Sequence, residues 1–326
     1  MKIVGVDLGG TTFTVGLVDE SGKIIKKIAR ETHVEEGKDK VIERIAEAVN
    51  EVATEDVEYV GIGSPGSIDR DNGIVRFSPN FPDWWDVPLA DEVEKRTKKK
   101  VFVENDANSF VLGEKWFGAG KDYDHIVALT LGTGIGGGVI THGKLLTGST
   151  GIGAELGHIV IEPNGPVCGC GVRGCLEAVA SGTAIKRFVM ESYKKFPDSK
   201  IFAIAGGPDK VTPKDVFEAV LLGDRLATLI RDRVVDALAR AIASYVHIFN
   251  PQVVIIGGGI SKAGDVLFNP LNERVNDYVM PSFLGTFKIV RSKLLDDAGV
   301  LGAVSIVLNR LSERGGGYGK SEDHPR

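Results

Sequence analysis

The sequence predicts an α/β protein built from two similar halves. Apolar stretches of strand length alternate with stretches of helical periodicity along most of the chain. The stretch from Ile3 to Gly10 is similar to the stretch from Ile126 to Thr133, at an offset of 123 residues. The length of 326 residues is about twice that of a common domain, which fits a duplication. We therefore expect two α/β halves that face each other across a cleft.

The first half is expected to begin with a meander of three strands. Each strand is rich in apolar residues, and the turns between them contain Gly-Gly-Thr-Thr and Asp-Glu-Ser-Gly. Helical and strand patterns alternate after the meander. The expected strands are 2–8, 13–18, 23–29, 57–62 and 101–103, and the expected helices are 39–52, 89–97 and 107–117.

The second half is expected to repeat this start and to contain an insertion. Gly143 to Leu146 is similar to Gly22 to Ile25, at an offset of 121 residues, so a second meander is predicted. Residues 150–213 depart from simple alternation and are expected to form the insertion. Regular patterns then predict helices at 229–249, 266–279 and 298–311 and strands at 253–256 and 287–290.

These elements predict two domains. The first is a small α/β domain of residues 1–118 completed by a C-terminal helix at about 298–312. The second is a large α/β domain of residues 119–297 that carries the insertion. The segment 313–326 is rich in Gly and charged residues, so a disordered tail is expected there.

Composition and charge argue against nucleic-acid and membrane partners. The chain has 39 basic and 44 acidic residues, a net charge of −5, which is ordinary for a globular protein. It has no run of about 18 apolar residues, and Met1 leads directly into a strand pattern without a signal-peptide pattern. We therefore expect a cytoplasmic protein.

Three glycine-rich turns follow predicted strands directly. They span 7–12, 131–138 and 256–260, in a chain with 42 glycines. Backbone N–H groups without neighbouring Cβ atoms suit phosphate oxygens, although a single turn of this kind also occurs in tight hairpins. Their occurrence at equivalent places in two halves favours a polyphosphate site. The P-loop pattern is absent, and Gly132-Thr133-Gly134 lies in a hairpin, so a Rossmann fingerprint is not supported.

The three cysteines form one local cluster with a histidine. Cys168, Cys170 and Cys175 follow His158 and together supply four ligands for a tetrahedral zinc ion. Since four protein ligands leave no open position, the zinc would be structural. A disulfide with one free thiol, or buried cysteines without metal, are the alternatives.

These motifs together resemble the ROK family (repressor, open reading frame, kinase). The resemblance covers about residues 2–311 and rests on Asp7-Leu8-Gly9-Gly10-Thr11, the loop 131–138, Gly153-Ala154-Glu155-Leu156-Gly157-His158 and the segment 168–177. It implies the actin-like ATPase fold, a duplication of ribonuclease-H-like domains with ATP and sugar in the cleft. It also implies ATP-dependent phosphorylation of the 6-hydroxyl of a hexose, with glucose as the expected substrate.

The resemblance also assigns residues to roles. Asp106 is implied as the general base, although Asn105-Asp106 is also an ordinary helix cap. Asp7 is implied to hold Mg²⁺ beside the phosphates, directly or through water. Its counterpart in the second half is Thr130, as expected if only one of the two copies holds the ion. The alternative is that Asp7 only caps the turn. For Glu155 and Glu177, the alternative to sugar binding is an exposed, solvated charge near the insertion. The implied sugar-binding residues are Asn105, Asp106, Glu155, His158, Glu177, Asn80 and Gly66, and the implied nucleotide-binding residues are Asp7, Gly9, Gly10, Thr11, Thr12, Gly132, Thr133, Gly134, Gly258 and Gly259.

Several functional alternatives stay open at this level. One alternative is another ROK sugar kinase, which would act on N-acetylmannosamine, N-acetylglucosamine, mannose or fructose. A second alternative is that polyphosphate replaces ATP as the phosphoryl donor. A sugar-sensing protein without turnover is a further class, although ROK repressors carry an N-terminal helix-turn-helix for which this chain has no room before Lys2. By analogy with the family, a homo-oligomer, dimer or tetramer, is expected.

Overall fold

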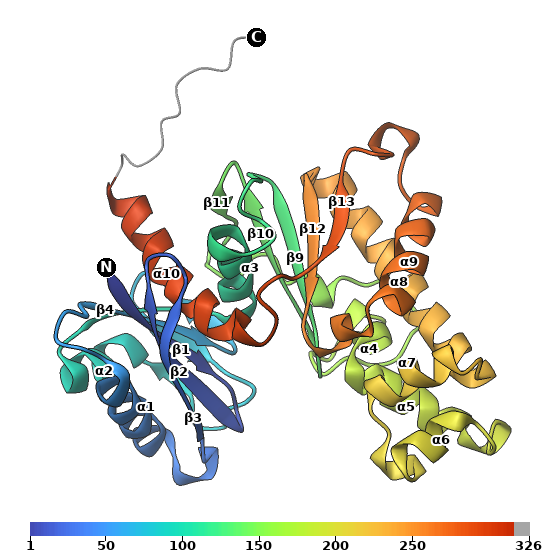
Figure 1. The fold of residues 1–326 in the computed structure, drawn as a ribbon, viewed down its shortest axis with the longest axis horizontal. Coiled ribbons are helices and arrows are strands. Elements are labelled where there is room, and N and C mark those ends of the chain that lie inside the picture. Colours follow the sequence, from blue (N-terminus) through green and yellow to red (C-terminus); the bar gives the residue numbers. More distant parts are fainter. Residues whose placement is uncertain (316–326) are drawn as a thin grey trace. The chain divides into compact units, whose positions relative to one another are not determined.

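The computed structural model describes residues 1–315, which form two compact units. Unit 1 contains Met1–Phe117, Ser149–Ile152 and the described residues from Asp296 onward. Unit 2 contains Gly118–Gly148 and Gly153–Leu295. Each unit has a five-stranded sheet with helices packed against it, as Figure 1 shows. The α/β class predicted from the sequence is confirmed.

The sheet of unit 1 combines an antiparallel meander with parallel strands. Its strands are β1 (Lys2–Leu8), β2 (Thr12–Asp19), β3 (Ile24–Glu31), β4 (Tyr59–Ser64) and β8 (Lys100–Asn105). The order is β3-β2-β1-β4-β8, with β1, β4 and β8 parallel to one another. These three strands are almost wholly buried, which explains their continuous apolar sequences.

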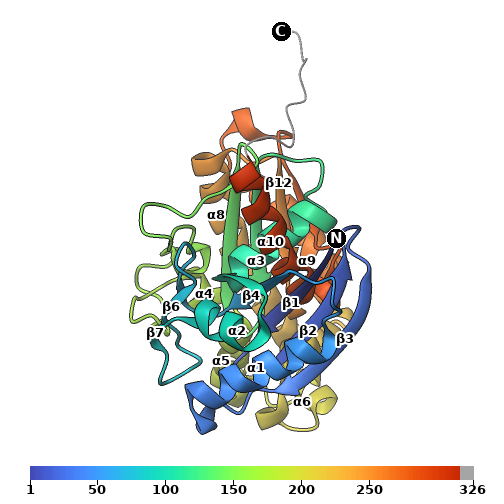
Figure 2. The ribbon, with the colours of Figure 1, turned by 90° about the vertical axis from the view of Figure 1, so that its left-hand side faces the viewer.

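Four helices cover the two faces of this sheet: α1 (Lys38–Val52), α2 (Leu89–Thr97), α3 (Asp106–Phe117) and α10 (Ala298–Gly315). Successive side chains of β1 point to opposite faces. Val4 and Val6 therefore join the core that α1 and α2 cover, and Figure 2 shows these two helices on the near side of unit 1. Gly5 faces α10 instead, and α10 also packs against α3.

α10 approaches the sheet at a row of three glycines. Gly5 on β1 lies in register between Gly16 on β2 and Gly61 on β4. A Cβ atom on Gly5 would lie 2.5 Å from the carbonyl oxygen of Val300, and a Cβ on Gly61 would lie 1.8 Å from that of Ala303. Because both clashes are with backbone atoms, the helix reaches the sheet only where side chains are absent.

The substitution Gly61→Ala is therefore expected to destabilise the protein strongly. The backbone of α10 must move away from β4, and such overpacking costs about 3 kcal/mol or more of unfolding free energy. Urea denaturation followed by circular dichroism measures this loss. A loss below about 1 kcal/mol would contradict the close packing of α10 against the sheet.

A small antiparallel sheet extends unit 1 and was not predicted. Its strands are β5 (Ser67–Asp69), β6 (Ile74–Phe77) and β7 (Trp85–Val87). The turn between β5 and β6 is held by the Asp69 carboxylate, which accepts hydrogen bonds from the backbone and side chain of Asn72. In the loop between β6 and β7, the buried rings of Phe81 and Trp84 stack with centroids 4.3 Å apart and join the core of unit 1.

The sheet of unit 2 has the same topology as the larger sheet of unit 1. Its order is β11-β10-β9-β12-β13, so β9, β10 and β11 repeat the meander and β12 takes the place of β4. The duplication predicted from the two similar stretches is confirmed in this pairing. The strands are β9 (Ile126–Leu131), β10 (Ile135–Thr141), β11 (Lys144–Leu145), β12 (Val253–Gly257) and β13 (Lys288–Arg291).

Helices of the insertion and of the second half form the rest of unit 2. The long helix α8 (Arg225–Phe249) buries one face, which includes Val234, Leu238 and Tyr245. Its periodicity also predicts Ile248 on this face, but Ile248 is 68% exposed. The Tyr245 hydroxyl donates a 2.5 Å hydrogen bond to the carbonyl oxygen of Leu156, which ties the insertion to α8. The helices are α4 (Leu176–Ala180), α5 (Gly182–Ser192), α6 (Lys200–Ala205), α7 (Pro213–Leu221), α8 (Arg225–Phe249) and α9 (Asp265–Arg274).

Three helix ends differ from the prediction by more than one residue. α8 begins at Arg225 rather than 229, because the Asp224 side chain accepts a hydrogen bond from the Ala227 amide and caps the helix. α9 ends at Arg274 rather than 279, where a 3₁₀ turn follows. α10 continues through Gly315 into the expected tail, since Glu313 pairs with Arg70 and Arg310. Residues 316–326, the rest of that expected tail, lie outside the described residues.

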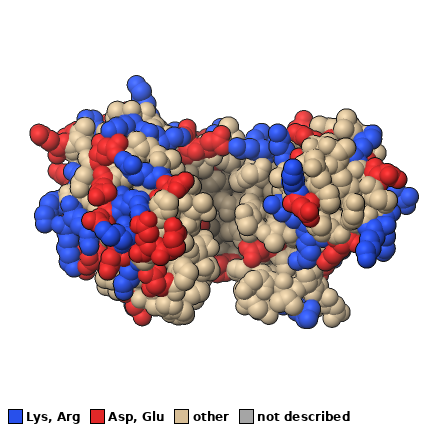
Figure 3. All heavy atoms as spheres, turned by 90° about the horizontal axis from the view of Figure 1, so that it is seen from below, with Lys and Arg blue, Asp and Glu red and all other residues tan. Residues whose placement is uncertain are grey.

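The surface carries charges of both signs. On the face shown in Figure 3, acidic and basic side chains are interspersed over both units. Within residues 1–315, no helix has the length and the apolar character that crossing a membrane requires.

Candidate active site

The candidate site in unit 1 lies at the carboxyl ends of its parallel strands. Asp7, Gly63 and Glu104 are in register across β1, β4 and β8. The glycine-rich turn 8–12, the loop after β4 and the start of α3 therefore leave the sheet at one edge. In open α/β sheets this edge is where ligands bind.

Asn105 and Asp106 form the junction between β8 and α3. The Asn105 side-chain oxygen accepts hydrogen bonds from the amides of Ala107 (2.9 Å) and Asn108 (3.2 Å), so Asn105 caps α3. Asp106 is the first residue of the helix and is exposed, and its Oδ1 accepts from the Ala107 amide at 2.9 Å. The helix start favours the ionised form of a carboxylate placed there.

Two further predicted sugar-binding residues lie at this edge. The Asn105 side-chain amide donates to the carbonyl oxygen of Gly66 at 3.0 Å, which links the loop after β4 to the start of α3. Asn80 is exposed and lies against the glycine-rich turn, because a Cβ atom on Gly10 would be 3.1 Å from the Cβ of Asn80. The structure thus brings Gly66, Asn80, Asn105 and Asp106 to the same part of unit 1.

The glycine-rich turn between β1 and β2 is held by its own backbone and by Thr32. The Gly9 amide donates to the Thr12 carbonyl at 3.1 Å, and Thr32 donates from its amide to Thr11 and from its hydroxyl to Gly9. Thr11 and Thr12 are exposed at the tip of the turn. The four nucleotide-binding residues predicted from 9–12 therefore form one ordered turn.

Asp7 is the penultimate residue of β1 and lies on the face covered by α10. Its Oδ2 lies against the first turn of that helix, where a Cβ atom on Gly299 would be 1.9 Å away. Burial raises the pKa of the Asp7 carboxyl. A cation bound beside Asp7 would offset this effect and hold the carboxylate in its ionised form.

Glu104 is a site residue that sequence reasoning missed. Its carboxylate is 1% exposed, and Oε1 accepts from the Asn105 amide (3.0 Å) and from the Asn108 side chain (3.1 Å). Oε2 faces Arg70 Nε at 3.0 Å, as an ion pair without the alignment of a hydrogen bond. Burial raises the pKa of Glu104, and the Arg70 charge opposes this. Glu104 thus fixes the backbone directly before Asp106.

Glu104→Ala is expected to lower the unfolding free energy by about 3 kcal/mol, because it leaves the Arg70 guanidinium buried without its carboxylate. Arg70 is only 13% exposed, and Glu313 at 3.3 Å is its other acidic partner. Chemical denaturation measures the change. The exposed Glu55→Ala is the control and is expected to change stability by less than about 0.5 kcal/mol. Equal effects of the two substitutions would show that the buried pair does not determine stability here.

The glycine-rich turn of unit 2 packs against the start of α5. The Gly182 amide donates to the Gly132 carbonyl at 2.8 Å, and the Thr183 hydroxyl donates to the Thr133 carbonyl at 2.9 Å. Ser181 caps α5 through the Ala184 amide. The N-terminus of this helix and the turn 132–134 therefore lie side by side, an arrangement that suits an anion.

A cavity of about 380 Å³ opens beside this helix start. Two lysines, Lys186 and Lys214, supply positive charge to it, and Pro213 and Ile260 supply apolar surface. Of the predicted residues, Gly132, Thr133 and Gly259 line it; Gly134 instead lies against Glu177, and Gly258 packs on Leu131. Sequence reasoning did not predict the lysines, because Lys186 and Lys214 are ordinary exposed residues of α5 and α7. The lining residues are Gly132, Thr133, Gly182, Thr183, Lys186, Thr212, Pro213, Lys214, Gly259 and Ile260.

Glu155, His158 and Glu177 gather around the insertion. Glu155 is exposed and precedes a 3₁₀ turn that ends at His158, whose amide donates to the Glu155 carbonyl at 3.1 Å. Although the residue as a whole is exposed, partial desolvation of its carboxyl raises the pKa of Glu155, and the nearby His158 opposes this. Glu177 Oε2 accepts a 2.9 Å hydrogen bond from the amide of Ile135, the residue that follows the glycine-rich turn 132–134. This contact ties α4 to the loop 131–138.

The predicted zinc ligands are brought together. The ligand atoms of His158, Cys168, Cys170 and Cys175 all lie within 4.8 Å of one another. Cys170 Sγ and Cys175 Sγ are 3.7 Å apart, and Cys168 Sγ is 3.6 Å from His158 Nδ1. A tetrahedral zinc site with Zn–S bonds of about 2.3 Å has S···S edges of about 3.8 Å, so the cluster has the size of such a site. Burial raises the pKa of the Cys168 thiol to about 12, so a thiolate there needs a cation.

Comparison with known proteins identifies the chain. The sequence model that describes the ROK family matches residues 3–310 of this chain. A glucokinase of Thermotoga maritima is 68% identical over 312 residues, which cover 95% of this chain and 98% of that protein. The crystal structure of a ROK family glucokinase from Streptomyces griseus in complex with glucose and AMPPNP is similar with a TM-score of 0.83 and 34% identity, covering 95% of this chain and 99% of that chain. A xylose repressor of Caldicellulosiruptor bescii is 31% identical over 316 residues, covering 95% of this chain and 79% of the repressor. This chain belongs to the ROK family.

Proposed function

We propose that this chain is an ATP-dependent hexose kinase that phosphorylates the 6-hydroxyl of glucose. The observation that carries the proposal is Asp106, an exposed carboxylate on a capped helix start at the ligand-binding edge of unit 1. A carboxylate in this position accepts the proton of an attacking hydroxyl. The 68% identity to a glucokinase supports the choice of glucose.

The remaining side chains of unit 1 hold the general base and the sugar. We assign Asn105, Asn80 and Gly66 to the sugar side of the site. Asn105 caps α3 with its side-chain oxygen and holds Gly66 with its nitrogen, so it fixes both loops around Asp106. The backbone N–H groups of the turn 9–12 and the carboxylate of Asp7 lie at the same sheet edge and are assigned to the phosphates.

Unit 2 supplies the nucleotide cavity and further sugar ligands. We assign the cavity between 132–133 and 259–260 to ATP, because its volume, two lysines and apolar wall suit a nucleotide with charged phosphates. Glu155, His158 and Glu177 are assigned to sugar hydroxyls. Mg²⁺ held near Asp7, directly or through water, would neutralise charge on the β- and γ-phosphates.

Zinc in the cluster of unit 2 is proposed as structural. Its four ligands leave no position for a catalytic water. One of them, Cys168, has its sulfur 3.4 Å from Glu177 Oε1, and another, His158, is itself an assigned sugar ligand. The ion would therefore fix two sugar-binding side chains, His158 as one of its ligands and Glu177 beside Cys168.

An ADP-release assay with Mg-ATP tests the proposal. The panel contains glucose, mannose, fructose, N-acetylglucosamine and N-acetylmannosamine, and a parallel series replaces ATP with polyphosphate. We expect the largest kcat/KM with glucose and ATP. A higher value with another sugar or donor would reassign the substrate. Sugar binding without ADP formation would overturn the kinase and favour a sensor, the class to which the xylose repressors belong.

A further inference from the structure

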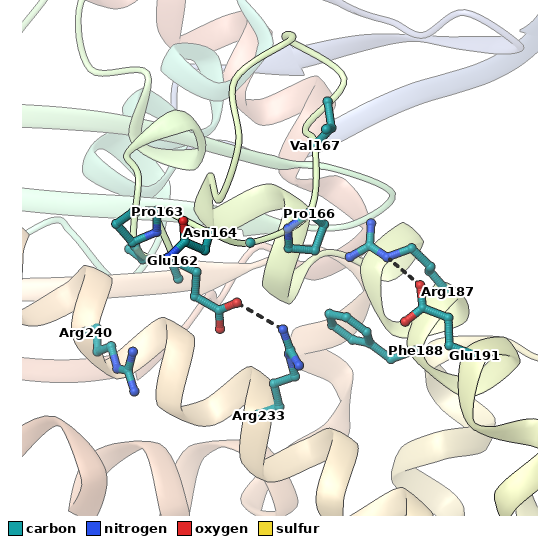
Figure 4. A pocket seen from close by; sticks show the side chains of 12 residues that line it. Glu162, Pro163, Asn164, Pro166, Val167, Arg187, Phe188, Glu191, Arg233 and Arg240 are labelled. Carbon is teal, nitrogen blue, oxygen red and sulfur yellow. Dashed lines mark hydrogen bonds and ion pairs between the residues drawn. The ribbon is translucent and has the colours of Figure 1, made fainter.

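A second cavity in unit 2 lies outside the candidate active site. Its volume is about 800 Å³, and it is formed by the loop 161–167, α5 and α8. Three arginines and two glutamates line it: Arg187, Arg233, Arg240, Glu162 and Glu191. Figure 4 shows these side chains around the opening, with Phe188 between Arg187 and Arg233. We call it the arginine cavity.

The guanidinium groups of the arginine cavity are held in place by weak, replaceable contacts. Arg233 Nη2 lies 3.0 Å from Glu162 Oε2, and Arg187 Nε lies 3.7 Å from Glu191 Oε1. Their side chains are 43% and 30% exposed, so each ion pair contributes about 1 kcal/mol or less. The Phe188 ring orients both arginines, with guanidinium carbons 4.1 Å and 4.8 Å from its centroid. The arginines are thus presented in a fixed place without being strongly neutralised.

The wall of the arginine cavity is connected to the metal cluster. The loop 161–167 lies between His158 and Cys168, which are both in the cluster. The amides of Ile161 and Glu162 donate to the carbonyl of Gly174 at 2.9 Å and 3.1 Å, next to Cys175. Arg187 Nη2 donates at 2.6 Å to the carbonyl of Ala178, the residue after Glu177. A ligand that moves this loop or Arg187 therefore acts on residues beside the sugar ligands.

We propose that the arginine cavity binds a hexose monophosphate and that this binding changes the affinity of the active site for sugar. Guanidinium groups bind phosphate dianions with two parallel hydrogen bonds. Arg240 is paired with Asp236 at 2.6 Å. A dianion would therefore bind Arg187 and Arg233 by replacing the carboxylates of Glu191 and Glu162. The volume far exceeds that of phosphate, and Glu162 and Glu191 provide acceptors for sugar hydroxyls. The coupling rests on the sugar-binding roles proposed above for His158 and Glu177; the binding itself does not.

Isothermal titration calorimetry with glucose 6-phosphate tests the binding directly. We expect two sites per chain in the wild type, one of them at the active site, and one site in the double variant Arg187→Gln/Arg233→Gln. The control Arg225→Gln removes an arginine at the start of α8 outside the cavity and is expected to keep both sites. Arg233→Lys keeps the charge but loses the paired donors, so we expect at least tenfold weaker binding at the cavity. Inorganic phosphate and glucose are titrated separately to show which part of the ligand is recognised.

Turnover measurements test the coupling. Without hexose phosphate, the double variant is expected to keep the kcat and glucose KM of the wild type. With glucose 6-phosphate present, we expect the apparent KM for glucose to change at least threefold more in the wild type than in the variant. An unchanged number of sites in the folded double variant would overturn the proposal. The proposal would also be overturned if the double variant kept glucose 6-phosphate binding but sedimented differently from the wild type. That result would make the cavity a contact between copies of the chain. If the wild-type protein shows no turnover but still binds glucose 6-phosphate at two sites, the proposed function is refuted and the proposal for the arginine cavity stands.

Discussion

Asp106→Asn is expected to lower kcat by about 10² to 10⁴-fold, because the amide cannot accept the proton of the attacking hydroxyl. The change keeps the size of the side chain and its exposed place at the start of α3. The cap from Asn105 and the fold around it should stay intact. The ADP-release assay gives kcat, and calorimetric titration with glucose gives the affinity, which we expect to change less than about tenfold.

Asp39→Asn is the matched control for this substitution. Asp39 is also an exposed carboxylate in the first turn of a helix of unit 1. It lies on α1, which follows β3, whereas Asp106 follows β8, and β3 and β8 are the two outermost strands of the sheet. We expect it to leave kcat unchanged. Near-normal turnover by Asp106→Asn, or an equal loss in both variants, would show that Asp106 is not the general base.

Cys175→Ser is expected to abolish stoichiometric zinc binding and to weaken sugar binding at least tenfold. Zinc binding supplies about 10 to 16 kcal/mol in small zinc domains, and replacing one thiolate by a hydroxyl, which is a poor zinc ligand, removes a large part of that free energy. Cys175 is fully buried and precedes α4, which carries Glu177. Elemental analysis gives zinc per chain, expected to be about one in the wild type. The glucose KM reports the effect on the sugar ligands.

Cys170→His provides the matched comparison, because Cys170 is exposed and an imidazole there can replace the thiolate. We expect this variant to keep most of the zinc and most of the sugar affinity. A wild-type protein purified without zinc and fully active after treatment with a chelator would contradict the structural role of the metal. Normal sugar affinity in a zinc-free Cys175→Ser variant would show that sugar binding does not depend on the metal.

Much of the fold could be predicted because its signals are local. The apolar runs of β1, β4 and β9 identify buried parallel strands, and the two similar meanders predict the shared sheet order. The position of Asp106 also follows from local sequence, since it comes directly after β8 and opens α3. Where a strand ends in a polar residue before a helix, the sheet edge is defined without knowledge of the rest of the molecule.

The features that sequence reasoning missed depend on residues far apart in the chain. Glu104 has an ordinary place in a strand sequence, and its role follows only from Arg70, which comes from the loop after β5. The strands of the small sheet β5–β7 are too short for a clear periodicity, and their buried residues join the unit 1 core together with Phe81 and Trp84 from a loop. The cavity-lining lysines likewise depend on where α5 and α7 meet the turn 132–133.

The glycine row beneath α10 has a consequence for the order in which the chain folds during synthesis. Unit 2 is complete once Leu295 has been made, whereas one face of the unit 1 sheet still lacks α10, the helix that covers Gly5, Gly16 and Gly61. At about 5 to 20 residues per second, residues 296–315 follow within about 1 to 4 s. The residues synthesised first are therefore the last to gain a finished core, and during that interval the uncovered sheet is the part of the newborn protein most open to a chaperone.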